Sequence, residues 1–364
     1  MAAERTLILL FIAAMVMISG CCCATNVPKS TPAPATPIPA TADGRMLGVD
    51  LTLPGDNNFS KAYFMAKDAG LSFVQLTPGW DDIEPAKGQY KDPQDNLAAA
   101  KAFYSAEGIK VALSVSPLDT NIDRVPADLK GKPMNDPAVI DRYNAMMDNV
   151  LSKLDGVTLQ DVSVGNEVDV SLGNNDTKWQ QYTDFYNAAR AHLKAEHPDL
   201  KIGVKATFYG LTRDNVEHLR TLNENSDVIL VTYYPLNPDF TVRDPSAVKG
   251  DFDKICSLYP GKEIYFLELG YPTSPLLNSS DEKQAEFVRQ TFAAWDGHKD
   301  RIKLVNFVYM HDIPKSSVDK MTGYYGLNDP KFAAYLGTLG LRTADGTDRP
   351  AWTAFTEEAK ARGF

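Results

Sequence analysis

The sequence has 364 residues, of which 44% are hydrophobic and 23% are charged. This composition is typical of a globular protein with ample apolar material for a core, and it excludes disorder for most of the chain. The formal net charge is -10, and Lys and Arg form no run. Because phosphate binding relies on clustered basic side chains, we expect no nucleic-acid partner and instead a neutral or small ligand.

The N-terminus has the layout of an export signal. Arg5 is followed by an apolar run from Leu7 to Ile18, which is too short to span a membrane, and small residues then lead into three cysteines. The segment ISGC, ending at Cys21, resembles the lipobox of bacterial and some archaeal lipoproteins. This resemblance implies cleavage before Cys21 and lipid attachment to its thiol, and an ordinary secretory signal is the alternative. We expect an exported protein, lipid-anchored at the cell envelope or cell surface.

Three parts of the chain are therefore predicted. Residues 1–20 form the signal peptide. Residues 21–43 are rich in Pro, Thr and Ala without apolar periodicity, so we expect a flexible tether. Residues 44–364 are expected to form a single folded domain.

The folded part repeats one theme, in which a short apolar run is followed by a polar and aromatic loop and then by an amphipathic helical pattern. Eight such runs are expected to be strands, at residues 46–54, 72–80, 110–117, 160–167, 201–208, 228–235, 264–272 and 303–311. Helical patterns lie between them at residues 58–70, 93–108, 137–154, 177–197, 213–225 and 279–295, several of which begin with Asp, Asn, Ser or Thr.

Strands that alternate with helices require a parallel sheet, and eight such units close into a barrel. A doubly wound sheet is the alternative. Two features favour the barrel: no strand is followed by a Gly-rich phosphate-binding turn, and the unusual polar and aromatic residues all fall at the C-terminal ends of strands. The sequence therefore predicts an α/β protein with a (β/α)8 TIM barrel and its active site at the C-terminal rim.

Two acids stand at that rim. Glu167 closes the fourth predicted strand and Glu268 closes the seventh, and both lie in runs that should be buried. A salt bridge or a helix cap would explain either acid alone. Together these explanations are weaker, because residues at the ends of strands four and seven face each other across the mouth of a barrel. Two facing carboxyl groups suit hydrolysis of a glycosidic bond, because one protonates the leaving oxygen while the other attacks the anomeric carbon or stabilises its charge.

The motifs around these acids carry a family resemblance. VGNEV at the end of strand four and FLELGYPT at the end of strand seven resemble the retaining (β/α)8 glycosidases of glycoside hydrolase clan A. The resemblance implies that Glu167 is the acid/base and Glu268 the nucleophile. It also implies that Asn166 hydrogen-bonds the 2-hydroxyl of the sugar.

Further segments extend this resemblance over most of residues 46–356. They are GWDDIEPAKGQY after strand two, VTYYP at the end of strand six, and GLRTADGTDRPAWTAF before the last helix. VTYYP and LELGYPT resemble the endo-galactanase and β-1,3-glucanase families, but strands one to three resemble neither, so no family is assigned.

Two positions depart from the clan pattern. Gln75 and Thr77 stand where many members carry an arginine, and VNFVYMHDIP stands where a tryptophan often ends strand eight. Tyr309 or His311 is expected to replace that tryptophan beneath the sugar. No second His, Cys or carboxylate has ligand spacing to His311 or Asp312, so no metal is expected. Hydrolysis by two carboxylates needs no cofactor, so none is expected either.

Other aromatic residues are candidates for substrate binding. Trp80 either stacks on a sugar ring or packs under the second loop. Tyr233 and Tyr234 follow each other in strand six, so only one of them points into the barrel. Tyr234 is favoured because it has the parity of Thr232.

Three hypotheses follow. The leading one is a monomeric retaining glycoside hydrolase that cleaves β-glycosidic bonds of an extracellular poly- or oligosaccharide by double displacement and touches the membrane only through its N-terminal lipid. The second is a non-catalytic carbohydrate-binding lipoprotein on a degenerate glycosidase barrel. The third is a transporter-associated solute-binding lipoprotein, which predicts two lobes and a hinge.

Overall fold

The computed structural model describes residues 43–55 and 58–364. The predicted signal peptide, the lipidation site Cys21 and all but the last residue of the predicted tether lie outside the described residues. Within the described part of the chain, no helix is both long and apolar enough to cross a membrane.

The described residues contain the eight predicted parallel strands. The strands form two hydrogen-bonded sheets, with the orders β1-β11-β10-β9-β8 and β2-β3-β6-β7. The two sheets are continuous in the chain at one side, because only Val204 separates β7 from β8. Seven of the eight are β1 (Met46–Val49), β2 (Phe73–Leu76), β3 (Lys110–Ser114), β6 (Leu159–Ser163), β9 (Val228–Tyr233), β10 (Glu263–Leu269) and β11 (Ile302–Phe307). The fifth predicted strand, residues 201–208, is divided into β7 (Ile202–Gly203) and β8 (Lys205–Thr207). Across the remaining seam, the Ser72 amide before β2 donates to the Leu47 carbonyl of β1 at 2.9 Å. The predicted (β/α)8 barrel is confirmed.

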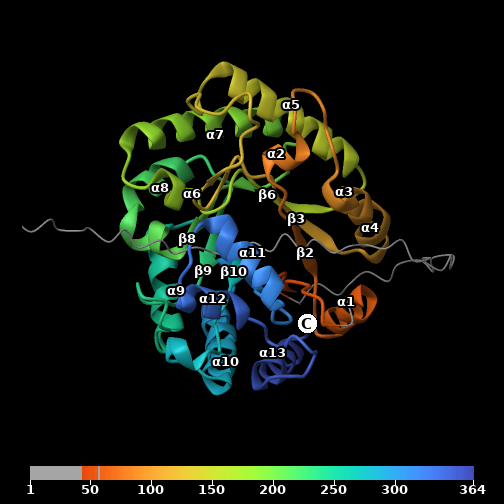
Figure 1. The fold of residues 1–364 in the computed structure, drawn as a ribbon, viewed down its shortest axis with the longest axis vertical. Coiled ribbons are helices and arrows are strands. Elements are labelled where there is room, and N and C mark those ends of the chain that lie inside the picture. The colour runs from red at the N-terminus through yellow and green to blue at the C-terminus, as the bar shows by residue number, and fades with distance from the viewer. Residues whose placement is uncertain (1–42, 56–57) are drawn as a thin grey trace, which may run out of the picture.

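Helices surround the strands (Figure 1). The outer helical segments are α1 (Phe59–Asp68), α3 (Asn96–Ala99), η2 (Ala100–Tyr104), α4 (Ser105–Glu107), α5 (Pro137–Lys153), α7 (Asp176–Glu196), α8 (Val216–Asn223), α9 (Ala247–Leu258), α10 (Asp281–Gly297) and α13 (Pro350–Ala361). Several begin as the sequence predicts, since the side chains of Asn58, Asp136, Asn175 and Ser280 accept a hydrogen bond from the first helical turn.

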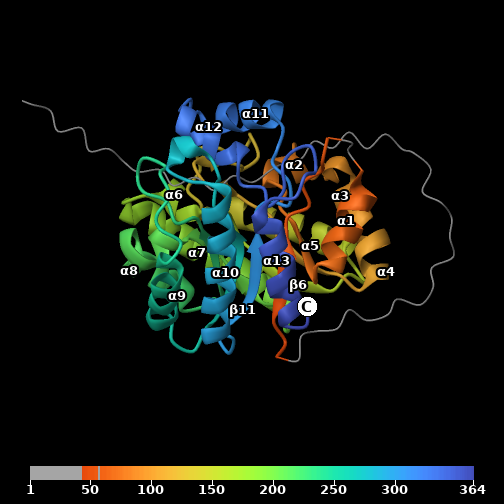
Figure 2. The same ribbon diagram turned by 90° about the horizontal axis from the view of Figure 1, so that it is seen from below.

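Short elements occupy the C-terminal ends of the strands. They are α2 (Trp80–Ile83), the β4 (Leu118–Asp119) and β5 (Ile122–Asp123) hairpin, α6 (Val168–Leu172), α11 (Lys315–Tyr325) and α12 (Pro330–Gly337). Figure 2 shows α11 and α12 together at one end of the molecule, beyond the strands.

The strands are buried on both faces, but the two faces differ. The outward residues pack against the helices in one large cluster that includes Ile229 and Val231. The inward residues near the strand starts form a separate apolar cluster of Met46, Phe73, Ala112, Val228, Leu230, Tyr265, Leu267 and Leu304. Beyond this cluster the inward positions become polar, as at Lys205, which pairs with Leu230, and Thr207, which pairs with Thr232. The barrel therefore has an apolar plug at one end and a polar layer at the rim.

Candidate active site

A tight turn places Glu167 at the rim. Gly165 has φ 105° and Glu167 has φ 44°, so the backbone turns sharply between the end of β6 and the start of α6. A Cβ at position 165 would lie 2.6 Å from the Tyr182 hydroxyl, so only glycine fits. The β4 hairpin fixes the turn, because Asn166 N donates to Leu118 O and Thr120 N donates to Asn166 O, each at 2.9 Å.

The Glu167 carboxylate meets neutral hydroxyl groups. Its Oε1 accepts from Thr232 Oγ1 at 2.5 Å, and its Oε2 accepts from Thr120 Oγ1 at 3.1 Å. The residue is only 1% exposed. Threonine hydroxyls both donate and accept, so these contacts suit a carboxyl group in either protonation state.

A bulge in β10 turns Glu268 into the barrel. Phe266 pairs with Val231 of β9 while Glu268 pairs with Thr232, so the intervening Leu267 is an extra residue. Simple alternation from the inward Tyr265 would direct Glu268 outward, and the extra residue reverses its side. Bulges of this kind often re-aim a side chain beside an active site.

The Glu268 carboxylate meets a cation. Lys205 Nζ donates to Oε1 at 2.8 Å, and the Tyr234 hydroxyl donates to Oε2 at 2.9 Å. Lys205 is fully buried and Glu268 is 2% exposed. Because a buried charge is tolerated only with a partner, the Lys205 ammonium is the partner that this buried carboxylate requires.

The two carboxylates meet at one strand end. Glu167 bonds Thr232 and Glu268 bonds Tyr234, and these partners are two positions apart in the chain at the end of β9. Glu268 is also the register partner of Thr232 in the pairing of β10 with β9, so both acids belong to the same strand end. This is the juxtaposition that the acids after strands four and seven predict.

Asn166 lies beside this pair. Its Nδ2 donates to Asp119 Oδ1 at 2.8 Å, and its residue is fully buried. Its Oδ1 has no hydrogen-bond partner among the described residues. The amide is therefore held by the protein and keeps an acceptor for a hydroxyl group of a ligand.

Further ionisable groups surround the pair. Asp50 accepts from Asn306 Nδ2 at 2.8 Å and Gln75 Nε2 at 3.2 Å, and burial raises its pKa to about 6. Burial raises the pKa of Asp161 to about 7, and neither of its carboxylate oxygens has a partner among the described residues. Burial, followed by the negative charges of Glu268 and Asp50, raises the pKa of Tyr309 well above its ordinary value.

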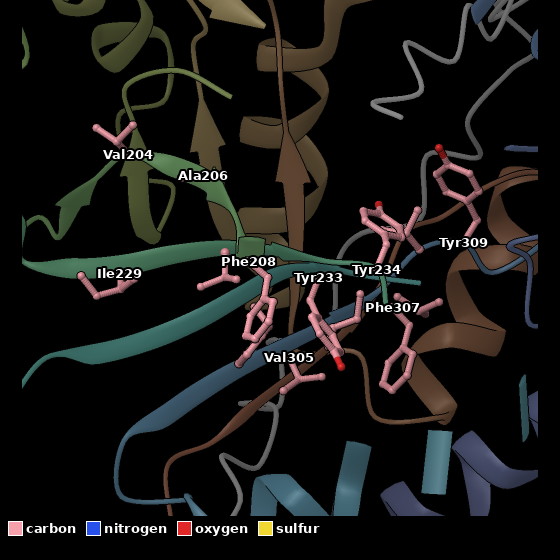
Figure 3. Packing of buried hydrophobic residues seen from close by; sticks show 14 of the residues in the cluster. Val204, Ala206, Phe208, Ile229, Tyr233, Tyr234, Val305, Phe307 and Tyr309 are labelled. Atoms are coloured by element: carbon pink, nitrogen blue, oxygen red, sulfur yellow. The ribbon is translucent and has the colours of Figure 1, made fainter. Parts of the chain in front are cut away.

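The predicted substrate-binding residues divide into two groups. Tyr234 and Tyr309 lie by the carboxylates, as does Asn166. Tyr233 points outward and donates to Asp251 of α9 at 2.7 Å, and Figure 3 shows its ring and that of Tyr234 on opposite sides of the strand. Strand alternation explains the difference.

Trp80 and His311 also lie elsewhere. Trp80 is fully buried, with its Nε1 donating to Glu84 at 3.0 Å and its ring edge-on to Tyr143, so it packs beneath the second loop rather than facing the site. His311 is fully buried, and its ring nitrogens contact the Thr52 carbonyl at 2.7 Å and Arg342 Nη1 at 3.0 Å. Of the alternatives left open by the sequence, the geometry supports Tyr234 over Tyr233, packing over stacking for Trp80, and Tyr309 over His311.

Several residues of the site were not predicted from the sequence. Lys205 had a detectable signal, since it is a charged residue at an inward position, with the parity of Thr207, in an otherwise apolar strand. Thr120 and Thr232 had none, because threonine is ordinary in strands and turns. Tyr335 of α12 was missed because no helix was predicted there, and burial with the neighbouring Tyr309, Glu167 and Glu268 raises its pKa well above the ordinary value.

The parallel barrel and the carboxylates after its fourth and seventh strands define a glycoside hydrolase of clan A. The model of the family described as "Glycosyl hydrolase family 53" matches residues 67–303, which is more than half of the chain and includes both glutamates. The chain belongs to glycosyl hydrolase family 53. A search of curated protein sequences found no significant match.

Several solved structures of glycoside hydrolases have the same fold. GH5_18 from Streptomyces cattleya, solved with GlcNAc, matches with a TM-score of 0.67 and 17% identity over 88% of this chain and 80% of that one. The exo-β-1,4-mannosidase Op5Man5 from Opitutaceae bacterium strain TAV5 matches with a TM-score of 0.67 and 17% identity over 88% and 61%. The intracellular xylanase TsXylA from Thermoanaerobacterium saccharolyticum matches with a TM-score of 0.60 and 17% identity over 88% and 98%. At these identities the likeness concerns the fold.

Proposed function

We propose that the protein is a retaining glycosidase that cleaves β-glycosidic bonds of an extracellular poly- or oligosaccharide, with Glu268 as the nucleophile and Glu167 as the acid/base. The observation that carries the assignment of roles is the difference between the two carboxylate environments. Glu268 is bonded by the Lys205 ammonium, and Glu167 accepts hydrogen bonds from the hydroxyls of Thr120 and Thr232. Acid and base roles are set by environments that favour different protonation states.

The first half of the reaction forms a covalent intermediate. Glu268 attacks the anomeric carbon while Glu167 transfers its proton to the departing glycosidic oxygen. Tyr234 and Lys205 each hold one oxygen of Glu268, which orients the carboxylate for attack. The free acceptor of Asn166 receives a hydroxyl of the bound sugar.

The second half of the reaction releases the sugar. Glu167, now ionised, takes a proton from a water molecule, which attacks the anomeric carbon and frees Glu268. The threonine hydroxyls bond Glu167 in both of its states because they donate to the carboxylate and accept from the acid. The reaction needs no cofactor.

The activity is tested with purified protein on β-glucans, galactans, mannans and xylans, by following reducing ends. We expect the wild type to act on one class and Glu268→Gln to lose activity on it. Glu167→Gln should lose about 10² to 10⁴ in rate, the usual contribution of general acid catalysis.

The two roles are separated with an aryl glycoside of the sugar identified in this way. A strongly acidic phenol leaves without protonation, so Glu167→Gln should still form the glycosyl–enzyme and give a burst of phenol, whereas Glu268→Gln should give none. If both variants lose the burst equally, the assignment of Glu268 as nucleophile and Glu167 as acid/base is wrong. An inverted anomeric configuration in the first product would exclude double displacement.

The lipid anchor is part of the same proposal. Its support is the ISGC segment that ends at Cys21. Cells given a labelled fatty acid should label the wild type in the membrane fraction, and Cys21→Ala should abolish both the label and the membrane association. Retention of the variant in the membrane fraction would contradict lipid anchoring at this cysteine.

A further inference from the structure

A cavity lies on the outer side of the barrel wall. Its volume is about 290 Å³, and it is lined by the segments that follow β8 and β9 and by α9. The Tyr233 hydroxyl donates at 2.7 Å to Asp251, which lines the cavity. Tyr234, the next residue, lies on the opposite side of the strand and bonds Glu268. The end of β9 therefore separates this cavity from the two catalytic carboxylates.

Buried apolar and aromatic side chains form one part of the lining. They are those of Phe208, Tyr209 and Leu236. The Phe208 ring packs edge-on against that of Tyr233, with centroids 5.0 Å apart, and Figure 3 shows the two rings next to each other. The Tyr209 hydroxyl donates to the Leu236 carbonyl at 3.0 Å. These contacts join the segments after β8 and β9, so the fold itself holds the apolar part of the cavity in shape.

The rest of the lining is polar and mostly cationic. Arg213, Arg243 and Lys254 contribute three positive charges, and Asp251 is the one acid among the described residues that line the cavity. The whole chain has a formal net charge of -10, so this excess of cations is local. Because a recess lined by charges of one sign attracts ligands of the opposite sign, the cavity favours an anion.

Two guanidinium groups meet at Tyr209. The Arg213 guanidinium lies over its ring, 4.6 Å from the centroid, and Arg243 Nη1 donates to its hydroxyl at 3.1 Å. Asp214 holds Arg213 through Nε and Nη2, and Asp251 holds Arg243 at 2.7 Å. Nη1 of Arg213 has no hydrogen-bond partner within the described part of the chain. Arg213 is therefore oriented by the protein and keeps donors for a ligand.

Lys254 provides a second cation for a ligand. Its ammonium has no ion pair and no hydrogen bond within residues 43–55 and 58–364. Lys249, on the same helix but outside the cavity, pairs with Asp253 at 2.8 Å. The ammonium of Lys254 is therefore available to a carboxylate that enters the cavity.

The two parts of the lining together define a class of ligand. A pyranose ring has an apolar face that suits Phe208 and Leu236, and a carboxylate on that ring suits Lys254 and Arg213. A neutral sugar would leave the cations unused, and an inorganic anion would leave the apolar part unused. The volume is close to the lower end for ligand pockets, about 300 Å³, so it suits one sugar residue rather than several.

We propose that this cavity is a second carbohydrate site, which binds one uronic acid residue with its carboxylate on Lys254 and Arg213. The cavity is separate from the site of the proposed function, since neither Glu167 nor Glu268 lines it. Two sites on one protein bind a single glycan more tightly than either does alone. A uronate bound here would hold the enzyme on a glycan that carries acidic residues while hydrolysis takes place inside the barrel.

Binding is measured first, by NMR titration of the purified protein with glucuronate and galacturonate and with their neutral counterparts, glucose and galactose. These free sugars contain no glycosidic bond, so the measurement does not depend on hydrolysis. We expect at least one uronate to bind about tenfold or more tightly than its neutral counterpart, and to bind several-fold more weakly in about 0.5 M salt, which screens the charges. Equal affinity for the charged and the neutral sugar would overturn the inference.

Inorganic sulfate distinguishes a sugar site from a site for any anion. We expect sulfate to bind more weakly than the uronate and to compete with it, because it meets the same cations without the apolar contact. Sulfate that binds as tightly as the uronate would overturn the assignment of a sugar. Uronate binding without hydrolysis of any polysaccharide would remove the proposed function but leave this site standing, and hydrolysis without uronate binding would do the reverse.

The location of the site is tested with a matched pair of lysines on α9. Lys254→Met should weaken uronate binding about tenfold, the usual worth of a hydrogen bond to a charged group, and Lys249→Met should leave it unchanged. Arg213→Met, also exposed, provides a second variant that should weaken binding, and thermal unfolding monitors the integrity of all three.

Glu268→Gln separates this cavity from the active site. We expect this variant to bind the uronate as tightly as the wild type, because β9 lies between Glu268 and the cavity. Unchanged affinity in folded Lys254→Met and Arg213→Met proteins would overturn the inference. Affinity that falls in Glu268→Gln but not in Lys254→Met would also overturn it, because the uronate would then occupy the active site.

Discussion

The floor of the active site and the helical pair of residues 315–337, the cover, lie at the same end of the barrel, but different contacts hold them. In the floor, the Glu268–Lys205 pair is buried within the barrel, and Asp161 lies near Lys205 without a hydrogen-bond partner among the described residues. The cover is held both by the polar bonds of Tyr324, which is 38% exposed, and by buried apolar side chains such as Phe332. Breaking a buried ion pair is costly and breaking a partly exposed hydrogen bond is much less so, so substitutions at these two kinds of contact should differ in their effect.

The largest effect is expected from the floor cation. Lys205→Met leaves Glu268 buried without its ammonium, which should cost about 3–5 kcal/mol of unfolding free energy and most of kcat. Lys201→Met is the matched control, because its ion pair with Glu263 joins side chains that are each 37% exposed and should cost under about 1 kcal/mol. Urea unfolding and steady-state kinetics measure both, and equal losses in the two variants would contradict the contrast between buried and exposed pairs.

A pH-dependent effect is expected at Asp161. Burial raises its pKa from 3.8 to about 7, so at intermediate pH the folded protein holds a proton that the unfolded chain has lost. Titration of Asp161 therefore lowers the free energy of unfolding of the wild type as the pH rises from about 4 to about 7. Asp161→Asn has no such titration. The unfolding free energy of the variant minus that of the wild type should therefore increase between about pH 4 and about pH 7, by roughly 4 kcal/mol at most.

Urea unfolding at a series of pH values measures this difference. Asp50 and Asp169 also have raised pKa values, but both remain in the variant and cancel in the comparison. The exposed Asp155 provides the control, since Asp155→Asn should give a difference that does not change with pH. A flat difference for Asp161→Asn would show that this carboxyl ionises normally in the folded protein.

A smaller effect is expected from the two adjacent tyrosines of strand six. Tyr234→Phe removes a hydrogen bond to the nucleophile and should lower kcat about tenfold, equivalent to about 1.4 kcal/mol. Tyr233→Phe removes a bond to Asp251 on the outer side of the barrel and should leave kcat unchanged. An equal loss of kcat in both variants would mean that the Tyr234 hydroxyl affects kcat through the packing of the strand and not through its hydrogen bond to Glu268.

The smallest effect is expected from the cover. Tyr324→Phe removes its bonds to Asp119 and Arg124, which together contribute about 1 kcal/mol, and should accelerate hydrogen exchange of residues 315–337 several-fold. Tyr104→Phe, on the outer ring of helices, should leave that exchange unchanged. Exchange in the cover that is as slow as in the wild type would show that Tyr324 does not hold it closed.

Most of the barrel was predictable because its strands are buried on both faces. A parallel strand between a filled interior and a ring of helices reads as a short apolar run, and all eight runs stand out in the sequence. The helical pair 315–337 was not predicted. Its residues Val318, Met321, Phe332 and Tyr335 are buried against the rim loops, and such contacts with distant segments leave no periodic signal strong enough to recognise.

Within the site, the sequence determined which acids stand at strand ends, and the tertiary structure decided their surroundings. Alternation alone separates Tyr234 from Tyr233, because side chains of a strand point to opposite faces. The same rule would direct Glu268 outward, and only the bulge at Leu267, visible in the pairing of β10 with β9, turns it toward Thr232.

The sequence by itself determined the barrel, the positions of Glu167 and Glu268 at its rim and the chemistry that two facing carboxylates allow, because these depend on local periodicity and residue type. Only the tertiary structure decided that Lys205 neutralises one acid, that threonine hydroxyls bond the other, and that residues 315–337 cover both. These features join segments far apart in the chain, and the free energy that selects them comes from burial, which local sequence does not specify.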